Sequence, residues 1–257
     1  MSQASNTSDS NHPAPAPTQE AATQAPERVE VSTQDAIELL GLLAFAELSA
    51  QMRLAVDAAL SPTPEHRLTH AGLSANAHGR MVALTNLIAE YGVDGQSVVV
   101  RYNDAFADYE SRTRSETWYE RVLKGYVGHS VALDFCKLVA EALPDNLQER
   151  ITAIIGKTNE SENAAAILSA KSESDPTFAS RLALWGRRLV GEALGQIQGL
   201  VISNPALERL VIAAAHNLGT EVSSPIVQEQ QKLETAWVFS KLTADHARRM
   251  DRIGLAA

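Results

Sequence analysis

Prolines mark out the helices of this chain. After residue 33, prolines stand where a helix is expected to begin, at Pro62, Pro64, Pro144, Pro176, Pro205 and Pro225. Proline fits the first helical turn because the N–H that it lacks would have no partner there, and an Asp, Asn or Ser just before it caps the helix. Apolar residues recur at helical spacing between these points. The sequence predicts an all-α fold, with helices near residues 34–60, 64–91, 97–113, 116–143, 145–170, 176–203, 205–218 and 225–252.

The chain divides into three parts. Residues 1–33 are rich in Ser, Thr, Gln, Ala and Pro, and we expect a disordered tail because such a segment buries too little apolar surface to offset the entropy of ordering. Residues 34–218 contain two pairs of long helices, which suit an antiparallel four-helix bundle with further helices around it. Residues 219–257 form a C-terminal helix that we expect to pack on the bundle or on a partner, including a second copy of the chain.

Charge and cysteine content limit the classes of function. The net charge of −9 repels phosphate backbones, so nucleic-acid binding would need a local basic patch. The candidates for such a patch are Arg187, Arg188, Arg248, Arg249 and Arg252. The single cysteine, Cys136, excludes a disulfide framework and fits a reducing compartment. Because neither a membrane span nor a secretory signal is apparent, we expect a cytoplasmic protein that does not contact a membrane.

Glu47 occupies an unusual position in the first predicted helix. The helical stripe on which it falls is otherwise apolar and faces the core, and its members are Ile37, Leu40, Ala44, Leu54 and Ala58. A carboxylate that points inward loses much of its hydration energy unless it is paired, hydrogen-bonded or bound to a metal. Inward-facing glutamates on long helices are typical of carboxylate-bridged two-metal bundles. Glu47 is therefore a candidate metal ligand.

Further polar residues lie on apolar faces of the other long helices. His78 lies near the core side of the second helix, where a histidine hydrogen-bonded at the edge of the core is the simpler interpretation. Glu120 is on the inner face of the helix near 116–143. Glu162 continues the inner stripe of the next helix, and Glu160 lies on a neighbouring face. These four are the remaining candidate ligands, although the acids could instead form a structural ion network with nearby Arg and Lys side chains.

The ligand count for a two-metal site is incomplete. A di-iron or di-manganese carboxylate site takes six ligands, one Glu from each of two helices and a Glu-x-x-His pair from each of the other two. Glu47 and Glu120 supply the two single glutamates. The two pairs are replaced by Ala75-Asn-Ala-His78 and Lys157-Thr-Asn-Glu160. The ammonium of Lys157 could neutralise the two glutamates in place of a metal.

Two segments of the sequence resemble a known family. They read Trp118-Tyr-Glu-Arg-Val-Leu-Lys-Gly-Tyr-Val-Gly128, followed by Ala132-Leu-Asp-Phe135, and Leu182-Ala-Leu-Trp-Gly-Arg-Arg-Leu-Val-Gly-Glu-Ala-Leu-Gly-Gln196. They are similar to ferritin-like proteins related to MiaE, the hydroxylase of methylthio-isopentenyladenosine in tRNA, and the resemblance extends from about Thr33 to about Leu210. It implies a ferritin-like four-helix core, a non-haem di-iron centre that activates dioxygen, and tRNA as a partner.

Carried over position by position, the resemblance assigns three metal ligands, Glu47, His78 and Glu120. It departs from the family pattern at Ala75 and Lys157, where bridging acids are expected, and at Glu160, where a histidine is expected. If the last tetrad slips by two residues, Glu162 becomes the candidate ligand.

Three functions remain open on these grounds. The ligand count favours a ferritin-like bundle with an incomplete or lost di-iron site, which acts as a binding or scaffolding protein. The alternative is an oxygen-dependent di-iron hydroxylase that acts on a modified tRNA base or a small apolar substrate, with iron as its cofactor. The third is an assembly module, in which the C-terminal helix presents a stripe centred on Trp237 to a partner or to a second copy, as in a homo-oligomer.

Overall fold

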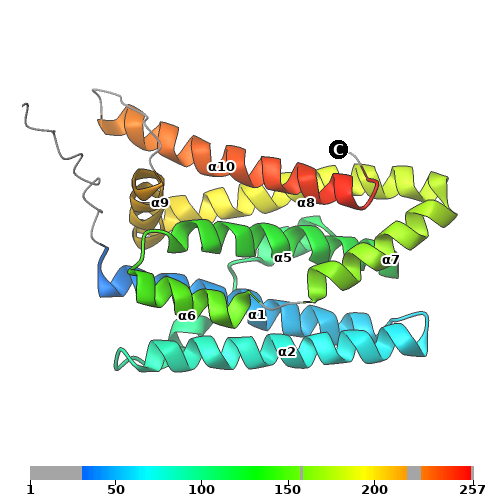
Figure 1. Cartoon of the computed structure of the whole chain (residues 1–257), viewed down its shortest axis with the longest axis horizontal. Coiled ribbons are helices and arrows are strands. Elements are labelled where there is room, and N and C mark those ends of the chain that lie inside the picture. Colours follow the sequence, from blue (N-terminus) through cyan, green and yellow to red (C-terminus); the bar gives the residue numbers. More distant parts are fainter. Residues whose placement is uncertain (1–30, 157–158, 219–226, 256–257) are drawn as a thin grey trace, which may run out of the picture.

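The computed structural model describes residues 31–156, 159–218 and 227–255, and the side chains of all of these except 227–234 (Figure 1). Within the described residues the protein is all-α, as the sequence predicts, and no strand occurs. The helices in chain order are α1 (Thr33–Ala59), α2 (Pro64–Ala89), α3 (Gly95–Val100), α4 (Ala107–Arg112), α5 (Trp118–Ala140), α6 (Asp145–Ile155), α7 (Glu160–Ser174), α8 (Pro176–Ser203), α9 (Pro205–Asn217) and α10 (Val227–Arg252). α5 packs on α1 on one side and on α8 and α10 on the other (Figure 1).

Three helix starts carry the cap that the prolines predict. α2, α8 and α9 each begin with proline, and in each the preceding side chain accepts a hydrogen bond from a backbone N–H of the first turn. These capping residues are Thr63, Asp175 and Asn204. Pro225 lies outside the described residues.

α1 is the central helix of the fold. Ser32 caps it through a reciprocal pair of hydrogen bonds with Asp35, and every residue from Asp35 to Glu47 is buried. An 18-residue window of α1 has a mean hydropathy of 1.5, so its length and composition would suit a membrane span, but 61% of that window is buried by the rest of the chain. The core helix of a bundle meets the same criterion, because a helix enclosed on all sides is apolar all round.

The single helix predicted over 97–113 is wrong. The structure has two short helices there, α3 and α4, and the break follows from the contacts of two buried tyrosines. The Tyr102 hydroxyl donates to Glu38 of α1 at 2.7 Å, whereas the Tyr109 hydroxyl donates to the backbone carbonyl of Lys124 of α5 at 3.4 Å. One straight helix would hold both tyrosines on the same face, so it could not direct them to two different neighbours.

The single helix predicted over 145–170 is also wrong. α6 ends at Ile155 with Gly156 as its C-cap, and α7 begins at Glu160. Glycine is the weakest ordinary helix former and a common helix end, so Gly156 interrupts the helix that the apolar pattern alone predicts. The break has a consequence for the site, because it places the Glu160 carboxylate in the first turn of α7, at the positive end of the helix dipole.

The described part of α10 packs on α5, α8 and α9. Its buried apolar side chains include Val238, Leu242 and Met250. Of the stripe predicted to face a partner, Trp237 is half-buried against the bundle and Lys241 is exposed, while the stripe before residue 235 lies outside the described side chains. The face that packs on the bundle is therefore rotated by one residue from the predicted stripe.

Candidate functional site

Glu47 lies at the centre of the bundle and pairs with Arg80 of α2. The Arg80 Nε donates to Oε2 of Glu47 at 2.9 Å, and its Nη2 approaches the same oxygen at 2.7 Å. Glu47 is 0% exposed and Arg80 is 9% exposed. Two charges taken out of water are tolerated only when each neutralises the other. The inward-facing carboxylate that the sequence predicts thus has a cationic partner on the neighbouring helix.

A second buried ion network begins six residues further along α1. Arg53 donates to Glu160 of α7 and approaches Asp57 at 3.4 Å, and Asp57 accepts from Arg121 of α5 at 2.6 Å. Burial by itself would lower the pKa of the Arg53 guanidinium, but Glu160 and Asp57 hold this pKa above its ordinary value. Burial would likewise raise the pKa of Glu160, but the His129 and Arg53 side chains hold it below its ordinary value. Both partners are therefore charged at neutral pH.

His129 of α5 lies between the two networks. Its Nε2 is 3.9 Å from Oε1 of Glu47 and 3.8 Å from Oε2 of Glu160, and its side chain is 9% exposed. The helices α1, α2, α5 and α7 thus each direct at least one ionisable side chain to the same region of the core. We call this set the polar cluster; it consists of Glu47, Arg53, Asp57, Arg80, His129 and Glu160.

Two of the five candidate ligands from the sequence, Glu47 and Glu160, meet in the polar cluster. His78 is exposed on α2, where its Nδ1 lies 3.2 Å from Oε1 of Gln51. Glu162 is exposed on α7. The structure therefore does not bring His78 and Glu162 to the same place as the two buried glutamates.

Glu120 caps a helix and does not face the polar cluster. Its carboxylate accepts from the backbone N–H groups of Thr117 at 3.0 Å and Glu116 at 2.7 Å, and the Thr117 hydroxyl accepts from the Glu120 N–H at 3.2 Å. Arg181 of α8 approaches the same carboxylate at 3.7 Å. This capping box fixes Glu120 in the first turn of α5, roughly 13 Å along the helix axis from His129.

The sequence predictions include neither the cations nor the histidine of the polar cluster, although the sequence contains a signal for them. Arg80 interrupts a buried stripe of α2 that is formed by Leu73, Ala77, Leu84 and Leu87. His129 interrupts a buried stripe of α5 that is formed by Val122, Tyr126, Leu133 and Cys136. An ionisable residue within an apolar stripe of alternating three- and four-residue steps is the feature that locates both. Lys157, the cation proposed from the sequence, lies outside the described residues.

The tetrads that face the polar cluster differ in register from those predicted. On α2 the tetrad that ends at the buried cation is Ala77-His-Gly-Arg80, two residues later than predicted. On α7 the tetrad that begins at the buried acid is Glu160-Ser-Glu-Asn163, three residues later than predicted. Compared with Glu-x-x-His, the first tetrad has a metal ligand at neither of the two ligand positions, and the second has only the acid.

These residues do not fit a two-metal centre. Such a centre takes six ligands, whereas the polar cluster offers two glutamates and one histidine near each other, and each glutamate is already bound to an arginine. A dication between these glutamates would lie close to two buried guanidinium groups, and like charges repel strongly where water is excluded. In the parts of the chain that the structure describes, no group of three His, Cys, Asp or Glu side chains is arranged to hold a metal ion.

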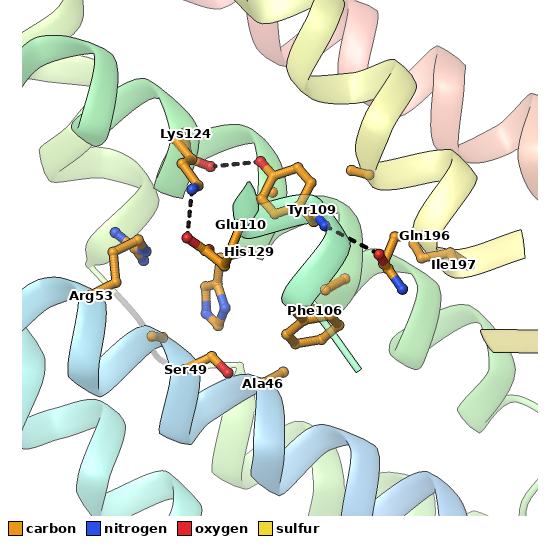
Figure 2. Close-up of a pocket in the computed structure, with 14 residues that line it drawn as sticks. Ala46, Ser49, Arg53, Phe106, Tyr109, Glu110, Lys124, His129, Gln196 and Ile197 are labelled. Atoms are coloured by element: carbon orange, nitrogen blue, oxygen red, sulfur yellow. Dashed lines mark hydrogen bonds and ion pairs between the residues drawn. The ribbon is translucent and has the colours of Figure 1, made fainter. Parts of the chain in front are cut away.

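A cavity of about 70 Å³ adjoins the polar cluster, between α1, α4, α5 and α8 (Figure 2). Arg53 and His129 form its polar wall, and Phe106 contributes apolar surface. The ring of Tyr109 closes another side of the cavity. Gly128 of α5 leaves room for this ring, because a Cβ at Gly128 would collide with the Tyr109 hydroxyl. The inner face of the bundle is therefore packed around a small space of mixed polarity.

A wider groove of about 400 Å³ continues this cavity toward solvent. Arg53, Phe106, Glu110 and Lys124 line both spaces. Apolar side chains of α1 line the outer part, namely Phe45, Leu48, Met52 and Val56. Several hundred cubic ångströms with mostly apolar walls and a few convergent polar groups are typical of a small-molecule site.

Comparison with known proteins supports the fold on independent grounds. Residues 32–214, more than half of the chain, match the family model described as the ferritin-like domain of actinomycetes. The matched region runs from the cap of α1 into α9 and includes the whole polar cluster. A comparison with curated proteins finds no significant match. The architecture, the convergence of four helices on a polar core and the family match agree, and the chain belongs to the actinomycete ferritin-like domain family.

Proposed function

We propose that this protein is a ferritin-like binding protein, in which arginine–carboxylate pairs stand in place of a di-metal centre and the adjoining cavity takes up a small molecule. The observation that carries the proposal is the Arg80–Glu47 pair, a guanidinium bound to a fully buried carboxylate at the centre of four helices. The guanidinium occupies Oε2 of Glu47, and its positive charge opposes the binding of a metal ion at the other oxygen.

The cavity and groove support the binding part of the proposal. Their polar lining groups belong to well-held side chains: Arg53 is bound to Glu160, and Lys124 is 8% exposed. Their apolar lining includes Met52, which is 63% exposed at the groove. A preformed concave surface with fixed charges and exposed apolar area is suited to a ligand that carries both kinds of surface.

Metal analysis tests the metal-independent core. The wild-type protein, purified from iron-supplemented cells, is expected to contain iron far below one atom per chain and to keep the same melting temperature in a chelator. A matched pair of variants, Arg80→His and Arg80→Met, separates two effects. Both remove the guanidinium, but only histidine adds a nitrogen ligand, so iron bound by Arg80→His and not by Arg80→Met is due to the new ligand. If the wild-type protein contains about two irons per chain, as a complete centre would, and loses them in Glu47→Gln, the proposal is refuted.

The second candidate function is the MiaE-like one, an iron- and oxygen-dependent hydroxylation of a modified tRNA base or a small apolar substrate. One observation favours it: the imidazole of His129 lies within 4 Å of a carboxylate oxygen of Glu47 and of one of Glu160, so side chains from three helices converge there. A prenylated tRNA nucleoside incubated with the iron-supplemented protein, a reductant and dioxygen would yield a hydroxylated product under this function. Absence of product together with absence of iron leaves the binding function.

Interaction with tRNA would also need a basic surface, and two of the proposed arginines are already engaged. Arg249 is bound to Asp134 and Arg248 to Asp245. Arg187, on α8, is exposed and has no such acid partner among the described contacts. We therefore rank tRNA binding below small-molecule binding, and a filter-binding assay at two salt concentrations decides between them, because phosphate contacts weaken steeply with salt.

A further inference from the structure

Lys124 lies where the inner cavity meets the groove, and its counter-ion is unusually exposed. Its Nζ donates to Glu110 at 2.6 Å, and the side-chain exposures are 9% for the lysine and 61% for the glutamate (Figure 2). The ammonium also lies 5.4 Å from the centre of the Tyr109 ring. A buried ammonium needs an anion, whereas an exposed carboxylate loses little when it returns to water. Glu110 is therefore a counter-ion that can be exchanged.

The other cations of this region are held differently. Arg53 is bound to Glu160, which is 7% exposed, and Arg121 is bound to Asp57, which is 0% exposed. These acids lie in the core and cannot move into solvent as Glu110 can. Of the basic side chains that line the groove, Lys124 is thus the one whose described anionic partner stands at the surface.

The groove beside Lys124 is apolar and partly open. Met52 and Val56 of α1 are 63% and 47% exposed, and Phe106 continues the apolar surface into the inner cavity. An alkyl chain that covers these side chains removes apolar surface from water, which is favourable. The complementary ligand therefore has a negative charge at one end, to pair with Lys124, and an apolar body that lies along the groove.

We propose that the ligand is a small anionic amphiphile, whose head group replaces the Glu110 carboxylate on Lys124 while its alkyl body lies in the groove along α1. The inference rests on the proposed binding function and specifies its ligand class. No bond is made or broken; the step is an exchange of one anion for another at Nζ of Lys124, and Glu110 moves into solvent as the head group enters.

Titration calorimetry with octanoate and with octanol tests the proposal. Wild-type protein is expected to bind octanoate at least about tenfold more tightly than octanol, because a hydrogen bond to a charged group distinguishes the two. Glu110→Gln removes the competing carboxylate and should tighten octanoate binding by about tenfold while octanol binding stays unchanged. Octyl phosphate tests whether any anionic head suffices, and binding comparable to octanoate extends the class to phosphates.

Variants of Lys124 and a surface control complete the design. Lys124→Met should abolish the preference for octanoate, and Lys124→Arg should restore it, so a folding defect in the first variant is separated from loss of charge. Asp108→Asn removes an exposed acid from the same short helix outside the groove and should leave both affinities unchanged. Equal binding of octanoate and octanol would overturn the anionic-head inference and leave the binding function standing. Binding of neither would overturn both.

Discussion

Arg80 of α2 and Glu47 of α1 form a hydrogen-bonded ion pair inside the bundle, where a related two-metal protein would place its ligands. The pair joins helices that are adjacent in sequence, and His129 lies beside it from a third helix. Because the carboxylate is wholly buried, the contact with this guanidinium offsets the hydration that the carboxylate loses. The stability of the fold and the chemistry available at the site are therefore set by the same contact.

Loss of one member of this pair should be far more damaging than loss of both. We expect Arg80→Ala to lower the free energy of unfolding by about 3–5 kcal/mol, because it leaves a buried carboxylate without a partner. The double variant Glu47→Leu with Arg80→Met should recover most of that loss, since apolar residues of similar size need no counter-charge. Urea unfolding followed by circular dichroism measures both.

An ion pair exposed at both ends provides the control. Arg150 of α6 donates to Glu90, at the end of α2, at 2.7 Å, and the side chains are 49% and 55% exposed, so Arg150→Ala should leave the free energy of unfolding nearly unchanged. Equal losses in Arg80→Ala and Arg150→Ala would contradict the importance given to burial.

Gly125 of α5 should be intolerant of any side chain. A Cβ at this position would overlap the guanidinium of Arg53, which must then leave Glu160. We expect Gly125→Ala to cost about 1–3 kcal/mol, typical of overpacking, and to weaken ligand binding in the cavity that Arg53 lines. Gly199→Ala on α8, where nothing lies within 4 Å of the added methyl group, should instead stabilise the helix by about 0.5–1 kcal/mol.

His246 of α10 should make the protein less stable in mild acid. Burial, and then the charge of Arg249, lower the pKa of His246 from 6.5 to about 4. Below 6.5 the unfolded chain takes up a proton that the folded chain refuses until about pH 4, so stability falls as the pH decreases through that window. His246→Leu should reduce the fall in melting temperature between pH 7 and pH 4, and part of the remaining fall comes from His70, whose pKa burial also lowers.

Two comparisons make this test specific. His78→Leu, at an exposed position, should leave the slope unchanged. Glu160 adds a separate loss at lower pH, because its folded pKa lies below the ordinary 4.5 and the stability from its ionised form disappears as the pH falls through that lower value. If the melting temperature of His246→Leu falls as steeply between pH 7 and pH 5 as that of the wild-type protein, His246 is not the source of the acid sensitivity.

Leu242 should contribute to the stability of the bundle itself. Its side chain is 1% exposed where α10 packs on the other helices, so Leu242→Ala should cost about 2–5 kcal/mol. Lys241→Ala, at the neighbouring exposed position, should be close to neutral.

Sedimentation at several protein concentrations tests the homo-oligomer expected from the sequence. The full chain is compared with a chain that lacks 227–257, because self-association through α10 must disappear when α10 is deleted.

The sequence predicts most helices because residues that are adjacent in the chain determine where these helices start. Pro176 and Pro205 follow capping residues and open α8 and α9 at the expected positions. The two failures, over 97–113 and 145–170, have different causes. Tyr102 and Tyr109 are drawn to different helices by contacts distant in sequence, which no local pattern contains. The break after Ile155 could have been recognised from Gly156.

The site was predicted in part for the same reason. Glu47 was found because one carboxylate in an apolar stripe is visible in a single helix. Glu120 was misplaced because its position was judged from the face alone, although Thr117-x-x-Glu120 is a capping-box pattern that fixes it at a helix start. The pairing of Arg80 with Glu47 could not be read from the sequence, since it depends on how α1 and α2 are set against each other.

Positively charged side chains of the same polypeptide balance the buried carboxylates of this bundle. Arg80 belongs to the same polypeptide as Glu47, so this pair forms as soon as α1 and α2 pack against each other. If the protein works without a metal, as we propose, its maturation needs no metal delivery, and starvation for transition metals should leave both its yield and its melting temperature as they are in replete cells.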